Sequence, residues 1–208
     1  VLVDLPKDVM AAKTELVPCQ GVNLRSYKPC YHPNIKQLHK VVQLIKESKK
    51  PLILSGGGVR LSLASKELRV LAKKILTPVS STLMGIGTYP SGDPLWLGMV
   101  GMHGTYSANM ATGECDLLIG IGVRFDDRVT GKTDRFAPNA RMVHIDIDPS
   151  SIRKTIPVSV PVVGDCKITL SLLLDLLDRE DFNGLQEARG AWLEKVNEWK
   201  ESKPFRYK

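Results

Sequence analysis

The sequence lacks several features that would assign it directly to a class of protein. No apolar run approaches the roughly 18–20 residues that a membrane span needs, so we expect no membrane protein. The four cysteines form no CxxC pair and no zinc-binding spacing, which indicates reduced thiols and no metal site. The net charge is +7, but no basic stripe is interleaved with aromatic residues. We therefore expect no nucleic-acid partner.

The chain also lacks an initiator methionine and a signal peptide. It opens on the apolar run Val1-Leu2-Val3-Asp4-Leu5, which predicts a short buried strand ending at Pro6. We therefore expect a piece of a longer polypeptide, with residues 1–10 as the end of a preceding domain. Residues 11–33 hold three prolines and show no sustained periodicity, so we expect a linker there.

From residue 34 onward, strand and helix patterns alternate about five times along the chain. Asn34 is placed to cap the first helix, and Trp192 and Trp199 lie seven residues apart in the last, a spacing that favours a packing stripe. Helices are predicted after residue 34 and over residues 62–76, 104–114, 166–178 and 184–201. Strands are predicted over residues 52–54, 78–82, 116–122, 141–148 and 158–163.

The alternation predicts an α/β fold, a doubly wound Rossmann-like parallel sheet of about six strands with helices on both faces. We assign the central domain to residues 34–180. Residues 181–208 are then a C-terminal helix and a linker towards a third domain. Ligands of such folds bind at the carboxyl ends of the strands, so the informative loops follow Leu54, Ser81, Ile121, Ile145 and Val163.

Two of these loops are rich in glycine. Gly56-Gly57-Gly58 lies between a predicted strand and a predicted helix, where glycines let a backbone approach a phosphate closely. A tight turn without a ligand explains the same residues equally well. The run from Gly120 begins like the dinucleotide fingerprint GxGxxG, but Phe125 stands where its last glycine would be.

Charged residues crowd the same loop. Arg124, Asp126, Asp127 and Arg128 lie within five residues. Two cations and two carboxylates at a strand end can bind a phosphate or an organic acid. They can equally neutralise each other as a salt-bridged loop.

Three aspartates follow the ends of predicted strands. Asp146 and Asp148 end one strand and Asp165 closes the next. A carboxylate there can accept hydrogen bonds from ribose hydroxyls, or it can cap a helix. His103 precedes a predicted helix, where it can cap that helix or contact a ring system.

Seven segments in this order resemble the acetolactate synthase (acetohydroxyacid synthase) large catalytic subunit. The likeness runs from residue 1 to about residue 178, and residues 122–131 are its most specific part. The segments are VLVDLPKDV (1–9), GGG (56–58), TLMGIG (82–87), GMHGT (101–105), GVRFDDRVTG (122–131), VHIDID (143–148) and GD (164–165).

This resemblance implies a transferase of branched-chain amino acid biosynthesis. The family condenses two pyruvates, or pyruvate and 2-ketobutyrate, to 2-acetohydroxy acids with release of CO2, using thiamine diphosphate and Mg²⁺. Its middle domain, which this chain matches, binds FAD. The flavin is required but does no net redox chemistry in the main reaction.

The resemblance also implies a set of FAD contacts, carried over position by position. Lys7 and Arg128 correspond to family residues near the mouth of the active site, where inhibitors bind. Val100 stands where leucine is common in the family. The implied FAD contacts are Gly57, Thr82, Leu83, Val100, Gly101, Met102, His103, Gly122, Val123, Arg124, Phe125, Asp126, Asp146, Ile147, Asp165 and Cys166.

The family's metal–diphosphate motif, Gly-Asp-Gly with a following Asn, does not occur in the chain. Gly92-Asp93-Pro94 and Gly164-Asp165-Cys166 both lack its second glycine. We therefore expect this chain alone to hold no catalytic residue, to bind neither thiamine diphosphate nor Mg²⁺, and to leave pyruvate unreacted. The resemblance further implies a parent homodimer or tetramer with a small regulatory subunit as a further partner. Its location would be the cytoplasm of a bacterium or an organelle of a eukaryote.

Three other readings stay open at this point. A stand-alone NAD-linked dehydrogenase shares the parallel sheet and the glycine-rich turns. A sibling thiamine enzyme, such as glyoxylate carboligase or pyruvate oxidase, shares the FAD-binding middle domain. A non-catalytic module could use the helix at residues 184–201 to dock a regulatory subunit, unless that helix is only a solvated C-terminal helix.

Overall fold

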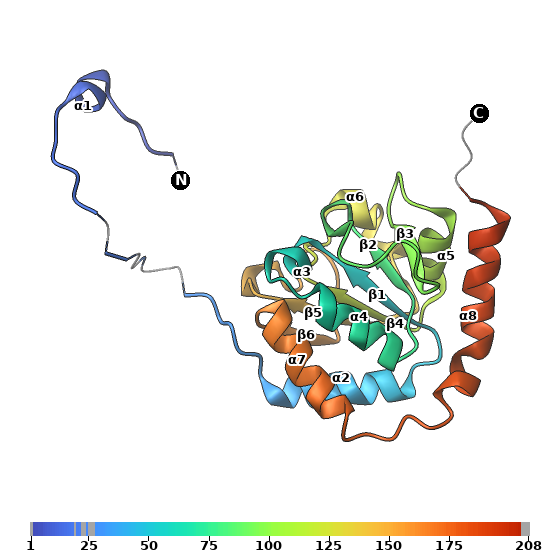
Figure 1. Ribbon diagram of the computed structural model, residues 1–208. Helices are drawn as coiled ribbons and strands as arrows, with labels where there is room; N and C mark the ends of the chain where they lie inside the picture. The colour runs from blue at the N-terminus through green and yellow to red at the C-terminus, as the bar shows by residue number, and fades with distance from the viewer. Residues whose placement is uncertain (1, 19, 22–23, 25–27, 205–208) are drawn as a thin grey trace.

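The computed structural model describes residues 2–18, 20–21, 24 and 28–204 (Figure 1). Within these residues, six parallel strands form one sheet with the order β3-β2-β1-β4-β5-β6. This is the strand order of dinucleotide-binding folds, so the predicted doubly wound sheet is confirmed. The strands are β1 (Pro51–Ser55), β2 (Val79–Ser81), β3 (Trp96–Met99), β4 (Leu117–Ile121), β5 (Arg141–Asp146) and β6 (Val160–Val163).

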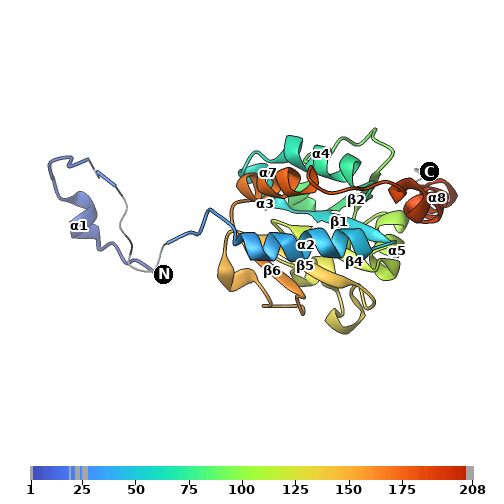
Figure 2. The ribbon, with the colours of Figure 1, turned by 90° about the horizontal axis from the view of Figure 1, so that it is seen from below.

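Helices cover both faces of the sheet (Figure 2). One face carries α2 (Ile35–Glu47), α4 (Ser65–Lys74) and α7 (Cys166–Leu177). The other carries α5 (Tyr106–Glu114) and α8 (Leu185–Ser202). The remaining helical segments are short: α1 (Lys7–Ala11), α3 (Gly57–Leu61), α6 (Asp127–Thr130), and the 3-10 turns η1 (Leu83–Gly85), η2 (Thr133–Arg135) and η3 (Pro149–Ser151).

The hydrophobic core forms two layers because successive side chains of a strand point to opposite faces of the sheet. Ile53 and Ile119 pack with the cluster under α2, α4 and α7. Their neighbours Leu52 and Leu118 pack with the cluster under α5 and α8. Strands covered on both faces read as continuous apolar runs, which is why the sequence located β1 and β4 correctly.

Asn34 caps α2 as predicted, since its Oδ1 accepts a hydrogen bond from the Lys36 backbone N–H at 2.9 Å. The strand expected over residues 1–5 is wrong for the described part. Leu2 to Leu5 are exposed and carry no strand, and Val1 lies outside the described residues. An apolar run becomes a strand only where a neighbouring strand takes its hydrogen bonds. The chain instead forms α1, which has no buried residue.

Strand β3 was not predicted. It is an edge strand that pairs only with β2, and its register shifts between Val79 and Ser80. Gly98 within it has a φ of +93°, and an added Cβ there would meet the Thr105 side chain at 2.4 Å. Glycine and an irregular register remove the alternating apolar pattern by which a strand is recognised.

Helix α8 packs along α5 rather than lying free in solvent (Figure 1). The rings of Trp192 and Trp199 meet edge to face with centroids 5.8 Å apart, and both are buried. The Trp192 Nε1–H donates to the Pro51 carbonyl at 3.0 Å, at the start of β1. The predicted packing stripe is therefore confirmed, and the interpretation of α8 as only a solvated helix is wrong.

Arg189 of α8 is a fully buried cation that contacts main-chain oxygens instead of a carboxylate. Its guanidinium donates to the carbonyls of Ile45 at 2.5 Å and Ser48 at 3.2 Å, to the Ile75 carbonyl, and to Thr77 Oγ1 at 3.1 Å. These carbonyls lie at the carboxyl ends of α2 and α4, where the helix dipole is negative. Burial lowers the pKa of Arg189 to about 10. One side chain thus fastens α8 to two helices of the opposite layer.

We expect Arg189→Met to lower the free energy of unfolding by at least about 3 kcal/mol, because it strands several buried acceptors at once. The measurement is a urea titration followed by circular dichroism. Arg179→Met removes an exposed arginine and serves as the control, with a change within about 0.5 kcal/mol. Equal unfolding midpoints for the two variants would show that the buried contacts contribute nothing.

Candidate cofactor cleft at the strand ends

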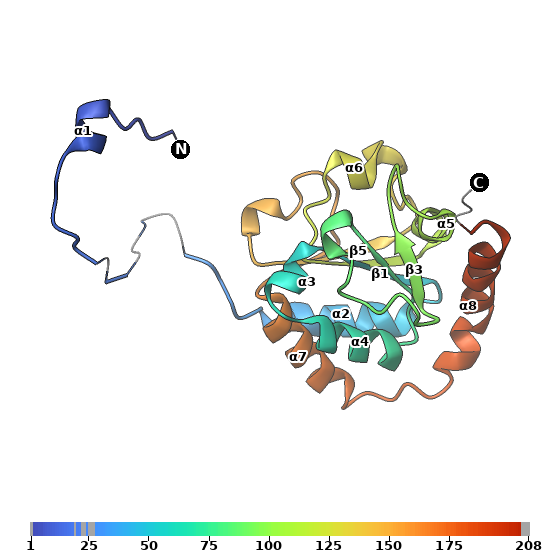
Figure 3. The same ribbon diagram turned by 45° about the horizontal axis from the view of Figure 1, so that its top comes forward.

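A cleft of about 820 Å³ opens at the carboxyl ends of the strands. It spans the point between β1 and β4 where the strand order reverses, the place at which ligands bind in open α/β sheets. Figure 3 turns this edge of the sheet forward and shows α3 and α6, which are the first helices after β1 and β4 along the chain. The cleft is lined by Gly57, Gly58, Arg60, Leu61, Thr82, Leu83, Met84, Met99, Val100, Met102, His103, Gly122, Val123, Arg124, Phe125, Asp126, Arg128, Val129, Asp146, Ile147, Asp148 and Ser151.

The structure brings most of the predicted site residues to this one cleft, although they come from five loops. Four predicted residues lie elsewhere. Gly101 faces a neighbouring cavity. Asp165 caps α7 through its carboxylate, which accepts from the Ile168 N–H at 3.0 Å. Cys166 is buried at the start of α7, and burial raises the pKa of its thiol to about 12. Lys7 lies in the exposed α1, apart from the sheet in Figure 1.

The glycines after β1 and β4 serve a contact between two backbones. The Gly58 N–H donates to the Gly122 carbonyl at 3.1 Å. A Cβ built on Gly58 would lie 2.7 Å from the Gly122 Cα, and one built on Gly122 would lie 2.6 Å from the Gly58 Cα. Gly122 also has a φ of +59°, a conformation that side chains rarely adopt. These glycines therefore set the floor of the cleft, where a bulky residue would force the loops apart.

Phe125, which interrupts the dinucleotide fingerprint, anchors the loop after β4. Its backbone has a φ of +52°, a strained value for a bulky residue. Its buried ring meets His144 and Phe136 edge to face, with centroids 4.9 and 5.9 Å away. A Cβ on Gly120 would fall 2.4 Å from this ring, so Gly120 makes room for Phe125 rather than for a phosphate.

Because Phe125 points inward, its neighbours Arg124 and Asp126 point outward and are exposed. Arg124 lies 3.6 Å from Asp126, and Arg128 lies 3.9 Å from Asp127. Asp126 is about half exposed and the other three side chains are largely exposed, and such long surface pairs contribute little stability. The salt-bridged interpretation of this loop therefore holds only in part, since its charges pair weakly, and ligand binding by the two arginines stays a prediction.

Asp146 ends β5 as a nearly buried carboxylate at the cleft. Its Oδ1 accepts from the Asp148 N–H at 2.9 Å, while burial raises the pKa of its carboxyl above the usual value. Behind it, the buried His144 holds Nε2 at 2.7 Å from the Val123 carbonyl and 3.8 Å from Asp146 Oδ2. A carbonyl only accepts, so Nε2 carries the proton. Burial lowers the pKa of His144, which keeps the imidazole neutral.

The rim of the cleft is apolar, which sequence reasoning did not foresee. The side chains of Leu61, Leu83 and Met102 are 82%, 69% and 70% exposed, and Met84 lies beside Leu83. Exposed apolar groups gathered at a hollow favour contact with a flat or apolar part of a ligand. Other lining residues that were missed include Gly58, Arg60 and Ser151, each a near neighbour in sequence of a predicted one.

His103 lies at the cleft with its side chain exposed and does not cap α5. That cap is Thr105, whose Oγ1 accepts from the Ala108 N–H at 3.2 Å. Asp148 does act as a cap, accepting from the Ser150 N–H at 2.9 Å at the start of η3. Among the described residues, no group of three or more His, Cys, Asp or Glu is placed to hold a metal ion, and no helix is long and apolar enough to cross a membrane.

Comparison with known protein families gives one match, to the model described as "Thiamine pyrophosphate enzyme, central domain", over residues 38–173. The chain belongs to this family of central domains. Its matched residues run from α2 to α7 and therefore contain all six strands and every loop of the cleft.

The relatives of this central domain are acetolactate synthase large subunits, which confirms the resemblance seen in the sequence. The protein of Haemophilus influenzae is 42% identical over 205 residues, or 98% of this chain. That of Cyanidium caldarium is 42% identical over 99% of the chain, and that of Methanocaldococcus jannaschii, named a probable large subunit, is 47% identical over 96%. The alignments cover 36%, 36% and 34% of these relatives, so this chain spans about a third of their length.

We expect the stability of this central domain to fall as the pH drops from about 7.5 to about 5.5. The imidazole of an unfolded chain takes up its proton near pH 6.5, whereas buried His144 takes it up only at lower pH. Below pH 6.5 the free energy of unfolding should thus fall by up to about 1.4 kcal/mol per pH unit. Asp146, with its raised pKa, acts in the opposite direction at lower pH.

Urea titrations at each pH would measure this slope. His144→Gln should flatten it, while His39→Gln, which removes an exposed histidine, should leave it as in the wild type. If the slope is unchanged in His144→Gln, the pH dependence of the free energy of unfolding comes from other groups.

Proposed function

We propose that this chain is the FAD-binding central domain of an acetolactate synthase large subunit. The parent enzyme would condense two pyruvates, or pyruvate and 2-ketobutyrate, to 2-acetohydroxy acids. The observation that carries the proposal is the gathering of the expected cofactor residues, from five separate loops, around one cleft at the switch point of the sheet.

The residues of the cleft suit a flavin dinucleotide. Gly57, Gly58 and Gly122 leave the main chain bare at the floor, where a pyrophosphate could approach it. Arg124 supplies a cation for that group, and Asp146 a buried carboxylate that accepts from ribose hydroxyls. The apolar rim offers a surface for the flavin ring. When bound, FAD would be required without net redox chemistry in the main reaction.

The role of this chain's own residues would be to bind and orient the cofactor. Phe125 and the Gly58–Gly122 contact hold the loops in place before a ligand arrives, so little order has to be gained on binding. Thiamine diphosphate and Mg²⁺ would be held by parts of the parent subunit that lie outside the matched third. Assembly as a dimer or tetramer, a small regulatory partner and the cellular location stay predictions.

An NAD-linked dehydrogenase is the second candidate, because the strand order alone suits either dinucleotide. Phe125 argues against it, since a buried ring occupies the position at which the fingerprint needs glycine for close packing. Glyoxylate carboligase and pyruvate oxidase also use FAD. Assaying the full-length parent on pyruvate and on glyoxylate would separate the carboligase from acetolactate synthase, and measuring acetolactate as the product from pyruvate would separate the oxidase.

Titration of the purified chain with FAD, followed by flavin fluorescence, tests the cofactor. We expect saturable binding that NAD does not displace. Asp146→Asn should weaken it about tenfold, because a hydrogen bond to a charged acceptor is lost. Asp175→Asn, on the exposed face of α7, is the matched control and should bind FAD like the wild type. Displacement of FAD by NAD would favour the dehydrogenase.

We also expect no acetolactate from this chain with pyruvate, thiamine diphosphate, Mg²⁺ and FAD, because the carbon–carbon bond chemistry belongs to the rest of the parent. A colorimetric acetoin assay over several hours provides the measurement, with a complete acetolactate synthase as positive control. Sustained product formation by the pure chain would refute this division of labour.

A further inference from the structure

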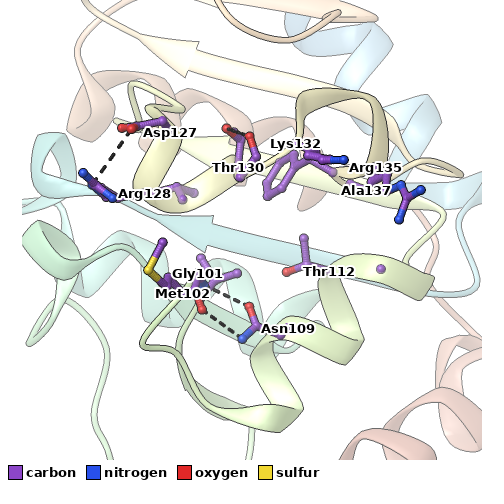
Figure 4. A pocket seen from close by; sticks show the side chains of 15 residues that line it. Gly101, Met102, Asn109, Thr112, Asp127, Arg128, Thr130, Lys132, Arg135 and Ala137 are labelled. Atoms are coloured by element: carbon purple, nitrogen blue, oxygen red, sulfur yellow. Dashed lines mark hydrogen bonds and ion pairs between the residues drawn. The ribbon is translucent and has the colours of Figure 1, made fainter.

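A second cavity, of about 510 Å³, lies beside the cleft, and most of its lining residues have no role in the function proposed above. Figure 4 shows Asn109 and Thr112 of α5 on one side of it, and Thr130, Lys132 and Arg135 of the segment from α6 through η2 on the other. We call it the basic cavity. It is lined by Val100, Gly101, Met102, Asn109, Thr112, Gly113, Asp127, Arg128, Val129, Thr130, Gly131, Lys132, Arg135, Phe136 and Ala137.

A thin wall separates the basic cavity from the cleft. Val100, Met102, Arg128 and Val129 line both hollows. Behind them the loop before α5 touches α6, since a Cβ built on Gly101 would lie 2.4 Å from the Arg128 carbonyl oxygen. The two hollows are therefore neighbouring sites.

The charge of the basic cavity is unbalanced. Its lining holds three cations, Arg128, Lys132 and Arg135, and one acid, Asp127. Asp127 lies 3.9 Å from Arg128, and both side chains are more than three-quarters exposed. Among the described residues, Lys132 and Arg135 have no carboxylate within 4.0 Å.

The rest of the described surface holds both paired and unpaired cations; Lys40 and Arg179, for example, have no carboxylate within 4.0 Å either. Around the helices, cations meet acids from distant parts of the chain at short distances. The pairs are Lys46–Glu180, Lys74–Asp178 and Lys195–Glu114 at 2.6 Å, and Arg141–Glu47 at 2.5 Å. Lys132 and Arg135 differ from the other unpaired cations named here because both line one hollow, together with Arg128.

The other polar groups of the lining already have partners. Asn109 accepts from the Gly101 N–H at 2.9 Å and donates to the Gly101 carbonyl at 3.0 Å. Thr112 donates to the Ala108 carbonyl at 2.8 Å, and Thr130 donates to the Asp126 carbonyl at 3.2 Å. A ligand would therefore find cationic donors, and Asp127, which lies beside Arg128, is the one carboxylate among the described lining residues.

The remaining walls of the basic cavity are apolar. Val129, Phe136 and Ala137 are wholly or partly buried and line it together with Val100. Phe136 is fixed by its edge-to-face contact with Phe125. The basic cavity thus combines apolar walls with a cationic edge, which suits an anion that carries an apolar body.

We propose that the basic cavity binds a small organic oxyanion, a carboxylate or a phosphate monoester, whose apolar part lies against Val129, Phe136 and Ala137. Lys132 and Arg135 hold its charged end, with Arg128 in the shared wall. The proposal is independent of the cofactor assignment, because none of Lys132, Arg135, Phe136 and Ala137 lines the cleft.

Benzoate and phenyl phosphate are suitable probes, with neutral benzamide as the uncharged match. Amide chemical shifts of the ¹⁵N-labelled chain report the place of binding, because Gly113 and Gly131 line the basic cavity but not the cleft. We expect at least one of the two anions to shift these amides saturably, more weakly as salt is added. The anion that binds more tightly shows whether the basic cavity prefers a carboxylate or a phosphate monoester.

The double variant Lys132→Gln/Arg135→Gln should weaken binding by about tenfold, since it removes two charge-assisted donors. Lys40→Gln/Arg179→Gln, which removes the same charge from exposed positions elsewhere, should change it less than about twofold. Lys132→Arg/Arg135→Lys keeps both charges and should retain binding. This result would show that the segment tolerates substitution at both positions. The proposal fails if neither anion shifts the glycine amides saturably, if benzamide shifts them equally, or if the first variant binds like the second.

Discussion

The meeting of two bare backbones at Gly58 and Gly122 is the contact on which the arrangement of the strand-end loops depends. Strands β1 and β4 are neighbours in the sheet, yet the chain leaves them in opposite directions, towards α4 on one face and towards α6 on the other. Their loops must pass each other at the switch point. Because Gly58 and Gly122 have no side chains, the two loops can pass in van der Waals contact, and a hydrogen bond of 3.1 Å joins them. The hollow then opens above this contact, so the floor of the cleft is main chain and its side chains come from the surrounding loops.

The loop after β4 is held in a different way, by a buried side chain on a strained backbone instead of by contacting glycines. Phe125 accepts an unfavourable backbone conformation so that its ring can fill the space left by Gly120. The buried contacts with His144 and Phe136 compensate for that strain. Because the ring fixes the middle of the loop, the residues before and after Phe125 point outward. One anchor thus shapes both the cleft and the wall shared with the basic cavity.

Much of the fold and of the site follows from the sequence because a parallel sheet is regular. Strands buried on both faces are apolar throughout, and the topology then brings their carboxyl ends to one edge. What the sequence hides are contacts between distant residues. Arg189 resembles any helical surface arginine until Ile45 and Ile75, more than a hundred residues earlier, are seen beside it. In the same way, Phe125 looks like a broken motif until Gly120 is seen beneath its ring.

The two hollows divide the charged residues that follow β4 between them. Arg124 and Asp126 line the cleft, together with Asp146 from β5 and the apolar rim. Lys132 and Arg135 line the basic cavity, whose one described acid, Asp127, lies beside Arg128. Arg128 belongs to both. Under the two proposals, this one loop would supply charge to both hollows. The acids of the loop pair too weakly to neutralise its arginines, which leaves that charge available.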